Sequence, residues 1–380
     1  MRNGTKRWLI SALALIAVGV LIFSMTACTA GFDMGRIFSG SYDDKTHEIG
    51  EIFSDININT DTADITFVKS DDENVKVICH ERKRGGHSVT VADGVLKIDV
   101  ADERKWYDHI GTNDETAITV YMPAGKYGSL VISESTGDLL IPTDFVFSDI
   151  DIDISTADVL LEASADGDVK IDASTGDIKI NDISVGGLLD VVVSTGDVSL
   201  SGVVCNSVNV AGSTGTTEIN SLFSSGGVAL ERSTGHINIV GLDALSLDIV
   251  TSTGKVNASD VKCADTAKVD VSSGDITFKN LRAETLMSNG DSGDVILTDT
   301  VIAGRVDIER DTGDVEFNSF DAAEIHINVS TGDVTGTLLS DKVYIIKTST
   351  GKIDVPDTIT GGRCEITTST GDVKISVVAE

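Results

Sequence analysis

The sequence is poor in aromatic residues, proline and basic side chains, and each shortage excludes a class of protein. Aromatic residues make up 5% of the 380 residues, so any core must be packed mainly with aliphatic side chains. Three prolines are too few for collagen or a proline-rich stalk. Lysine and arginine total 29 against 60 aspartates and glutamates, which gives a net charge of −31. Because this charge repels phosphate, we expect no nucleic-acid partner.

An uncharged segment follows three basic residues at the N-terminus. Residues 8–30 carry no charge, and the preceding Arg2, Lys6 and Arg7 favour a cytoplasmic N-terminus. At about 1.5 Å per residue, the apolar part of this segment would span roughly 30 Å, the thickness of a membrane's hydrocarbon core. We therefore predict a cytoplasmic tail over 1–7, a transmembrane signal anchor over 8–30 and a tether over 31–47. The protein would be single-pass in the cell membrane, with its C-terminal body extracellular.

Two other interpretations of this N-terminal segment remain open. It could be a secretory signal that is cleaved from the mature chain. It could also be a lipoprotein signal, since Met25-Thr26-Ala27-Cys28 loosely fits the need for a cysteine after small residues. All three interpretations place the residues beyond about position 32 outside the cytoplasm.

A four-residue motif, Ser-Thr-Gly-Asp, recurs at steps of 19 or 20 residues through most of the chain. Its glycine is replaced once, by Ala157. Thirteen copies in one register are the signature of a repeat array. The motif glycines are Gly137, Gly176, Gly196, Gly215, Gly235, Gly254, Gly274, Gly293, Gly313, Gly332, Gly351 and Gly371.

Apolar residues alternate with polar ones on both sides of each motif. The second and fourth positions after the glycine are each apolar in twelve of the thirteen copies, and many are β-branched. This period of two predicts strands with one buried face. A unit of about twenty residues cannot bury that face alone, so the units must stack. We predict an all-β fold, a parallel β-solenoid of about 13 coils with about 19–20 residues per coil, over 129–380.

The motif is predicted to form the corner of each coil. A sharp bend needs a residue that tolerates positive φ, and glycine supplies it. Aspartate follows the glycine in nine copies, so a row of carboxylates should run along the rod, hydrated, hydrogen-bonded or bridged by cations. The calcium-binding motif Gly-Gly-x-Gly-x-Asp is absent, and we expect no metal site here. The nine aspartates are Asp138, Asp158, Asp177, Asp197, Asp275, Asp294, Asp314, Asp333 and Asp372.

The two ends of the array differ from its middle. Residues 48–128 lack the motif but alternate in longer segments, which predicts an antiparallel β cap over the first coil. Within this cap, Trp106, Tyr107 and His109 form a candidate recognition loop, and the alternative is a loop whose Trp106 packs on the cap or on the first coil. No cap follows Asp372, so the last strand is either a short solvated end or an edge that pairs with a partner or a second copy.

The usual signatures of catalysis and metal binding are missing. There is no Gly-x-Ser-x-Gly elbow, phosphate-binding glycine loop, Cys-x-x-Cys or His-Glu-x-x-His spacing. We therefore expect no enzymatic activity, no cofactor and no zinc. Cys205 and Cys263 lie three coils apart, roughly 14 Å, which is too far for a disulfide. We predict free, mostly buried thiols at Cys79, Cys205, Cys263 and Cys364.

The tandem Ser-Thr-Gly-Asp-Val repeats, the N-terminal segment, Lys105-Trp106-Tyr107-Asp108-His109 and residues 361–372 together resemble a known bacterial family. It is a domain-of-unknown-function family with β-strand repeats, whose members are named as candidate adhesins of Gram-positive cell envelopes. The resemblance covers about 48–380. It implies a β-solenoid at the cell envelope, but no established reaction and no functional residues.

Three functions follow as expectations. The first is a membrane-anchored, extracellular and non-catalytic β-solenoid that acts as an adhesin or envelope-interaction surface. Its ligand would be an unknown extracellular one, either a cell-wall glycan or a protein. The second is a polysaccharide-acting β-helix enzyme, for which Arg232, His236 and Arg310 are candidates, although we favour solvent-facing substitutions at these positions. The third is an envelope-stress signalling accessory protein that docks a membrane partner through the cap.

Overall fold

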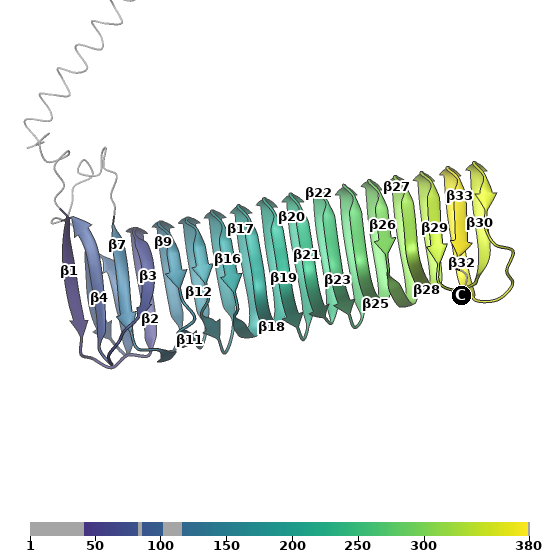
Figure 1. The fold of residues 1–380 in the computed structure, drawn as a ribbon. Helices are drawn as coiled ribbons and strands as arrows, with labels where there is room; N and C mark the ends of the chain where they lie inside the picture. Colours follow the sequence, from purple (N-terminus) through teal and green to yellow (C-terminus); the bar gives the residue numbers. More distant parts are fainter. Residues whose placement is uncertain (1–41, 83–85, 102–115, 379–380) are drawn as a thin grey trace, which may run out of the picture.

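The computed structural model describes residues 42–82, 86–101 and 116–378, which form one elongated rod of stacked strands (Figure 1). All 33 of the strands belong to one continuous sheet that winds around the rod, and no helix occurs in these ranges. Consequently no helix able to cross a membrane is found in this part of the chain. The predicted tail and anchor over 1–30, and the tether up to residue 41, lie outside the described residues.

A typical coil contains three strand segments separated by bends. β12 (Ile150–Thr156) leads to the corner motif, β13 (Val159–Leu161) leaves it, and β14 (Ser164–Ala165) follows. β12 pairs in parallel with β15 (Val169–Thr175), its equivalent one coil later, so that each residue faces its counterpart. The predicted all-β parallel solenoid is therefore confirmed.

In the middle of the rod the same segments merge into longer strands. The remaining strands up to the C-terminal coils are β9 (Leu130–Thr136), β10 (Leu139–Ile141), β11 (Phe145–Phe147), β16 (Ile178–Asn181), β17 (Ser184–Thr195), β18 (Val198–Thr214), β19 (Thr217–Ser224), β20 (Gly227–Thr234), β21 (Ile237–Ala244), β22 (Ser246–Thr253), β23 (Val256–Cys263), β24 (Thr266–Ser273), β25 (Ile276–Ser292), β26 (Val295–Thr298), β27 (Val301–Thr312), β28 (Val315–Thr331) and β29 (Val334–Leu338).

Aliphatic side chains fill the inside of the rod in vertical stacks. Ile152, Ile171 and Val191 lie directly above one another in successive coils, and all three are fully buried. Burying each such side chain contributes about 1.5–3 kcal/mol, so the stability of a coil depends on its neighbours. Buried aromatic residues pack together in two parts of the rod: Phe67 and Phe145 pack edge to face at 6.2 Å near the first coils, and Phe317 and Phe320 stack at 4.8 Å in β28.

A second column of bends lies six residues after the corner glycine, and sequence reasoning missed it. Its members adopt left-handed backbone with φ between 51° and 74°. Glycine, asparagine, aspartate and serine occupy the column, since short polar side chains tolerate this conformation best among non-glycine residues. The eight residues are Asp182, Gly202, Ser221, Gly241, Asp260, Asn280, Asp299 and Ser319.

The N-terminal cap is antiparallel only in its outer part. β1 pairs antiparallel with β4, β4 with β7, and β5 with β6. In contrast, β2 and β3 pair in parallel with β9 and β10, so Asp61-Thr62-Ala63-Asp64 forms a true corner of the stack. The strands of this region are β1 (Tyr42–Ile49), β2 (Asp55–Thr62), β3 (Asp64–Lys69), β4 (Val75–Arg82), β5 (His87–Ala92), β6 (Val95–Val100), β7 (Ala117–Met122) and β8 (Gly125–Lys126).

The last two coils are stacked in the reverse of their sequence order. β32 (Gly362–Thr370) pairs with β28 on one side and with β30 (Lys342–Thr350) on the other. Likewise β33 (Val373–Val377) lies between β29 and β31 (Ile353–Asp354). The yellow end of Figure 1 shows β32 and β33 inside and β30 at the tip.

This order corrects the expectation that the final strand forms the open edge of the rod. The open edge belongs to β30 and β31, and Pro356, which has no backbone N–H to leave unpaired, lies two residues after β31. The last copies of the corner motif also do not form complete turns of the solenoid, because residues 355–361 contain no strand. The solenoid therefore has about 12 turns rather than the 13 that the motif count predicts.

Candidate functional site

The corner glycines form one straight column along the rod. All twelve have positive φ, between 126° and 157°. The column is also tightly stacked: a Cβ atom at Gly196 would lie 1.9 Å from the carbonyl oxygen of Gly176 in the preceding coil. Both the backbone conformation and the close approach of neighbouring coils therefore demand glycine. Ala157 does not have a positive φ, which explains why alanine is accepted there.

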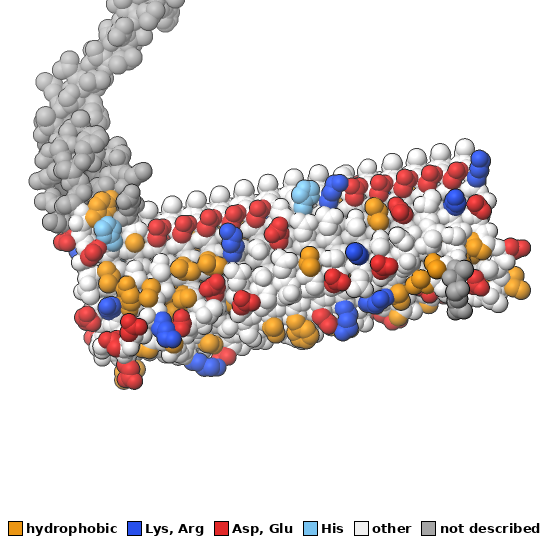
Figure 2. Space-filling view, viewed as in Figure 1, with side chains coloured by type: hydrophobic (Ala, Val, Ile, Leu, Met, Phe, Trp, Pro, Cys, Tyr) orange, Lys and Arg blue, Asp and Glu red, His pale blue; other side chains and the backbone are white. Residues whose placement is uncertain are grey.

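The aspartates after the corner form a hydrogen-bonded ladder on the surface. The Oδ1 atom of each accepts a hydrogen bond from the backbone N–H of the next aspartate along the stack, at 2.7–3.2 Å. Figure 2 shows the ladder as red rows along one edge of the rod. It has two runs, Asp64, Asp138, Asp158, Asp177 and Asp197, and then Asp275, Asp294, Asp314, Asp333 and Asp372.

Three residues of other types separate the two acidic runs. Thr216, His236 and Lys255 occupy the ladder positions there, and the Lys255 N–H donates to Nδ1 of His236 at 3.1 Å. The Nζ atom of Lys255 lies 2.8 Å from the carboxylate of Asp275 and lowers the pKa of that group by hydrogen bonding. The ladder thus links successive coils through hydrogen bonds from backbone amides, with one lysine paired to Asp275, and this gives it a structural role.

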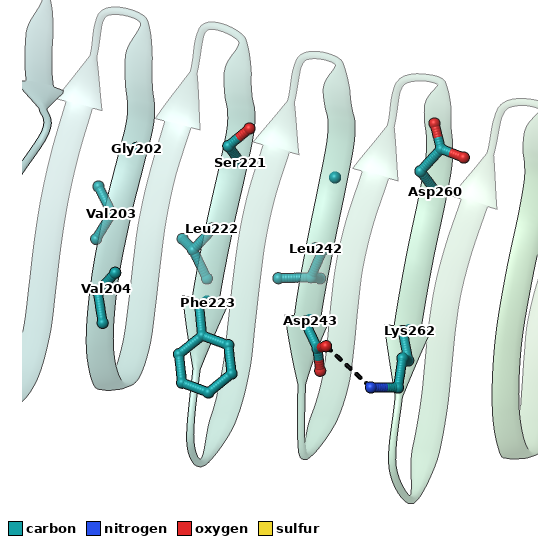
Figure 3. Close-up of a pocket in the computed structure, with 11 residues that line it drawn as sticks. Gly202, Val203, Val204, Ser221, Leu222, Phe223, Leu242, Asp243, Asp260 and Lys262 are labelled. Carbon is teal, nitrogen blue, oxygen red and sulfur yellow. Dashed lines mark hydrogen bonds and ion pairs between the residues drawn. The ribbon is translucent and has the colours of Figure 1, made fainter.

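A shallow apolar groove crosses four coils on another face. Its floor is formed by the buried side chains of Val203, Leu222 and Leu242, and the second bend column borders it. Val204 and Phe223, each 49% exposed, stand side by side on β18 and β19 (Figure 3). Other large apolar side chains are exposed along the rod, but these two are adjacent in register and line the groove, which makes this face a candidate binding site.

Opposite charges continue the same row of side chains beyond Phe223. Asp243 on β21 and Lys262 on β23 occupy the next two coils in register, and their charged atoms lie 3.0 Å apart (Figure 3). Both side chains are about half exposed, so the pair contributes little to stability and stays free to bond a ligand. The groove therefore combines an apolar half with a polar half in one line along the rod.

The expectation that Arg232 and Arg310 face solvent is wrong, because both are buried. They lie three residues before a corner glycine, in a column that points inward. The preceding coil has glycine at the same position, Gly212 or Gly290, and this leaves space for the guanidinium group. His236 is exposed, as expected.

Hydrogen bonds inside the rod hold these two guanidinium groups. Nε of Arg232 donates to Oγ1 of Thr217 at 2.8 Å. Nη1 of Arg310 donates to the Val271 carbonyl at 3.0 Å, and Nη2 to Oγ of Ser288 at 2.9 Å. Burial lowers the pKa of both arginines. Because they are buried and four coils apart, they do not form the surface site that the enzyme hypothesis needed.

The other predicted residues divide into two groups. Cys79, Cys205, Cys263 and Cys364 are free and buried, as expected, and burial raises the pKa of Cys205 to about 11 and of the other three to about 12. Trp106, Tyr107 and His109 of the candidate recognition loop lie outside the described residues.

The family model that matches the sequence covers almost all of the rod. It is the Toastrack DUF4097 model, matched by residues 53–278 and 262–380. The chain belongs to the Toastrack DUF4097 family. This agrees with the resemblance stated from the sequence, which covers about 48–380. Among curated proteins, no sequence matches this Toastrack chain.

Several solved structures are similar to this Toastrack chain. One is a candidate adhesin from Bacteroides fragilis, with 13% identity, coverage of 89% of this chain and 98% of that one, and a TM-score of 0.24. A candidate cell adhesion protein from Clostridium sporogenes has 8% identity, coverage of 90% and 100%, and a TM-score of 0.18. A candidate lipid binding protein from Parabacteroides distasonis has 14% identity, coverage of 89% and 98%, and a TM-score of 0.19. At these TM-scores the likenesses carry no argument about this chain.

Proposed function

We propose that this protein is an adhesin-type rod of the cell envelope that binds a cell-wall glycan along the groove between Gly202 and Lys262 and performs no chemistry on it. In this proposal residues 8–30 anchor the chain in the cell membrane and the rod lies outside the cell. The observation that carries the proposal is the row Val204, Phe223, Asp243 and Lys262, aligned over four consecutive coils.

The chemistry of the row fits a carbohydrate chain. A sugar ring offers an apolar C–H face, which can pack on the exposed ring of Phe223. Its hydroxyl groups can donate to the Asp243 carboxylate and accept from the Lys262 ammonium group. The net charge of −31 disfavours polyphosphate polymers, so a neutral or cationic glycan is the expected ligand.

The geometry of the groove supports binding rather than catalysis. Glycoside hydrolysis needs two carboxyl groups facing one bond, whereas the described lining contains Asp243 paired with Lys262 and Asp260 at a bend. A long, flat and regularly spaced surface suits an extended polymer better than a small molecule.

Sedimentation with insoluble cell-wall glycan tests this proposal. Phe223→Ser should weaken retention about tenfold, which corresponds to about 1.4 kcal/mol of lost ring contact. Val250→Ser is the matched control, because Val250 is 40% exposed and lies outside the groove lining. Equal retention of both variants, or no retention of the unmodified protein by any glycan, would overturn the proposal. Retention by envelope proteins alone would replace the glycan with a protein ligand.

A further inference from the structure

The interior of the N-terminal cap holds a cluster of side chains that the groove does not use. Cys79 and Glu81 lie two residues apart on β4, so both point to the same face of the strand. His87 begins β5 and lies against them. One thiol, one carboxylate and one imidazole thus come together, with their sulfur, oxygen and nitrogen atoms all within 4.8 Å of one another.

This set of ligands is the one that zinc prefers. Zn²⁺ binds cysteine sulfur at about 2.3 Å and histidine nitrogen or carboxylate oxygen at about 2.0–2.2 Å, so its ligand atoms stand about 3–4 Å apart. The His87 Nδ1 and Glu81 Oε2 atoms already lie 3.0 Å apart. Adjustments of side chains, without a change of backbone, would bring all three atoms around one ion.

The surroundings hold the imidazole and the carboxylate in place. Nε2 of His87 is 2.8 Å from Oγ1 of Thr60, an outer contact of the kind that fixes the ring of a metal-binding histidine. The backbone N–H of His87 donates to Oε2 of Glu81 at 2.7 Å. Gly86 makes room for the carboxylate, because a Cβ atom there would lie 2.1 Å from Oε1 of Glu81.

A cation already faces the carboxylate from the solvent side. Nζ of Lys45 lies 2.6 Å from Oε1 of Glu81, which is 1% exposed, whereas the Lys45 side chain is 42% exposed. A buried carboxylate that stays ionised is stabilised by a positive partner. The long lysine side chain can move into water, and a bound ion would then supply the charge from inside.

We propose that Cys79, Glu81 and His87 bind one zinc ion inside the N-terminal cap, and that the ion displaces Lys45 from Glu81. The spacing Cys-x-Glu-x₅-His differs from the zinc-binding spacings Cys-x-x-Cys and His-Glu-x-x-His. The sequence alone therefore predicts no zinc site. The three protein ligands leave a fourth position on the ion for water. Binding would join β4 to β5 and stiffen the end of the rod nearest the membrane in the proposed orientation.

Cobalt substitution tests the site in the full-length protein. Co²⁺ bound to a thiolate gives an intense near-ultraviolet charge-transfer band, and we expect this band to saturate at one Co²⁺ per chain and to disappear when Zn²⁺ is added. Cys79→Ser should abolish the band. Cys205→Ser is the matched control, since Cys205 is also free and buried but lies far along the rod, and it should keep the band.

A second variant separates a metal site from an ordinary ion pair. Lys45→Met removes the competing cation, so it should bind Co²⁺ at least as tightly as the unmodified protein, and Zn²⁺ should raise its melting temperature. If Lys45 only neutralises Glu81, this variant would melt lower and gain nothing from Zn²⁺, which would overturn the proposal. A folded, unmodified protein that gives no thiolate band, or a band that survives in Cys79→Ser, would also overturn it.

Discussion

Gly196→Ala should open one coil of the rod, whereas Gly241→Ala should leave the rod nearly intact. Both glycines have positive φ, 148° at Gly196 and 74° at Gly241. They differ in the space around them. A Cβ atom at Gly196 would lie 1.9 Å from the backbone oxygen of Gly176, but the nearest atom to one at Gly241 is 3.7 Å away. The pair therefore separates backbone strain from the close stacking of coils.

The expected magnitudes follow from these two contributions. Alanine in the left-handed region costs about 1–2 kcal/mol, and this is the whole effect expected at Gly241. At Gly196 the backbone lies in a region used almost only by glycine, which costs about 1–3 kcal/mol, and steric overlap with backbone adds about 1–3 kcal/mol. A loss of about 3 kcal/mol or more at Gly196 corresponds to roughly 150-fold faster amide exchange.

Hydrogen exchange measured by mass spectrometry is the suitable assay, because a long repeat array does not unfold in two states. Peptides that cover residues 176–215 should lose protection in Gly196→Ala, while distant coils keep theirs. Gly241→Ala should change exchange near residue 241 by about tenfold. If both variants lose the same protection, or if Gly196→Ala exchanges like the unmodified protein, the close stacking of corners is refuted.

Two further predictions concern polar groups inside the rod. Burial raises the pKa of Glu134 to about 8, so the stability that its protonation gives is complete below about pH 4.5 and is lost as pH rises through 8. Amide protection of β9 should therefore fall by a few kcal/mol between pH 5 and 8, and Glu134→Gln should remove this dependence. Separately, Gly212→Ala should destabilise its coil by about 1–3 kcal/mol, because the Cβ atom would lie 2.1 Å from Nη1 of Arg232. Adding Arg232→Val should recover part of that loss, measured as amide protection of the same coil, and strictly additive effects would contradict the inferred contact.

The repeat made the fold predictable, because one register fixes many positions at once. A residue such as Ile171 could be assigned to the core from its column alone, and it is fully buried. The same reasoning failed for Arg232, since a charged residue in the repeat was taken to face solvent although its column points inward. The sequence did hold a signal, namely glycine at the same position one coil earlier, in Gly212 before Arg232 and in Gly290 before Arg310.

Other features could not be obtained from periodicity. Gly332, Gly351 and Gly371 are separated by 19 and 20 residues, the same steps as in the rest of the array. The spacing therefore does not reveal that the last two coils are stacked in reverse order. The cap cluster depends on tertiary packing, which brings His87 at the start of β5 within 3.0 Å of Glu81 on β4. The groove at Phe223 depends on how side chains of separate coils stand beside one another, and a single coil shows no trace of it.

Distances between spin labels test the stacked order of coils most directly. Asp248, Glu365 and Ile345 belong to one column on the same face of the rod. Glu365 lies five coils from Asp248, and Ile345 lies six coils from it. With about 4.8 Å per coil, labels on Asp248→Cys and Glu365→Cys should lie about 24 Å apart, and those on Asp248→Cys and Ile345→Cys about 29 Å apart. The longer distance to Ile345→Cys is the result that the structure predicts. A longer distance to Glu365→Cys, or distances that do not increase with coil number, would contradict it.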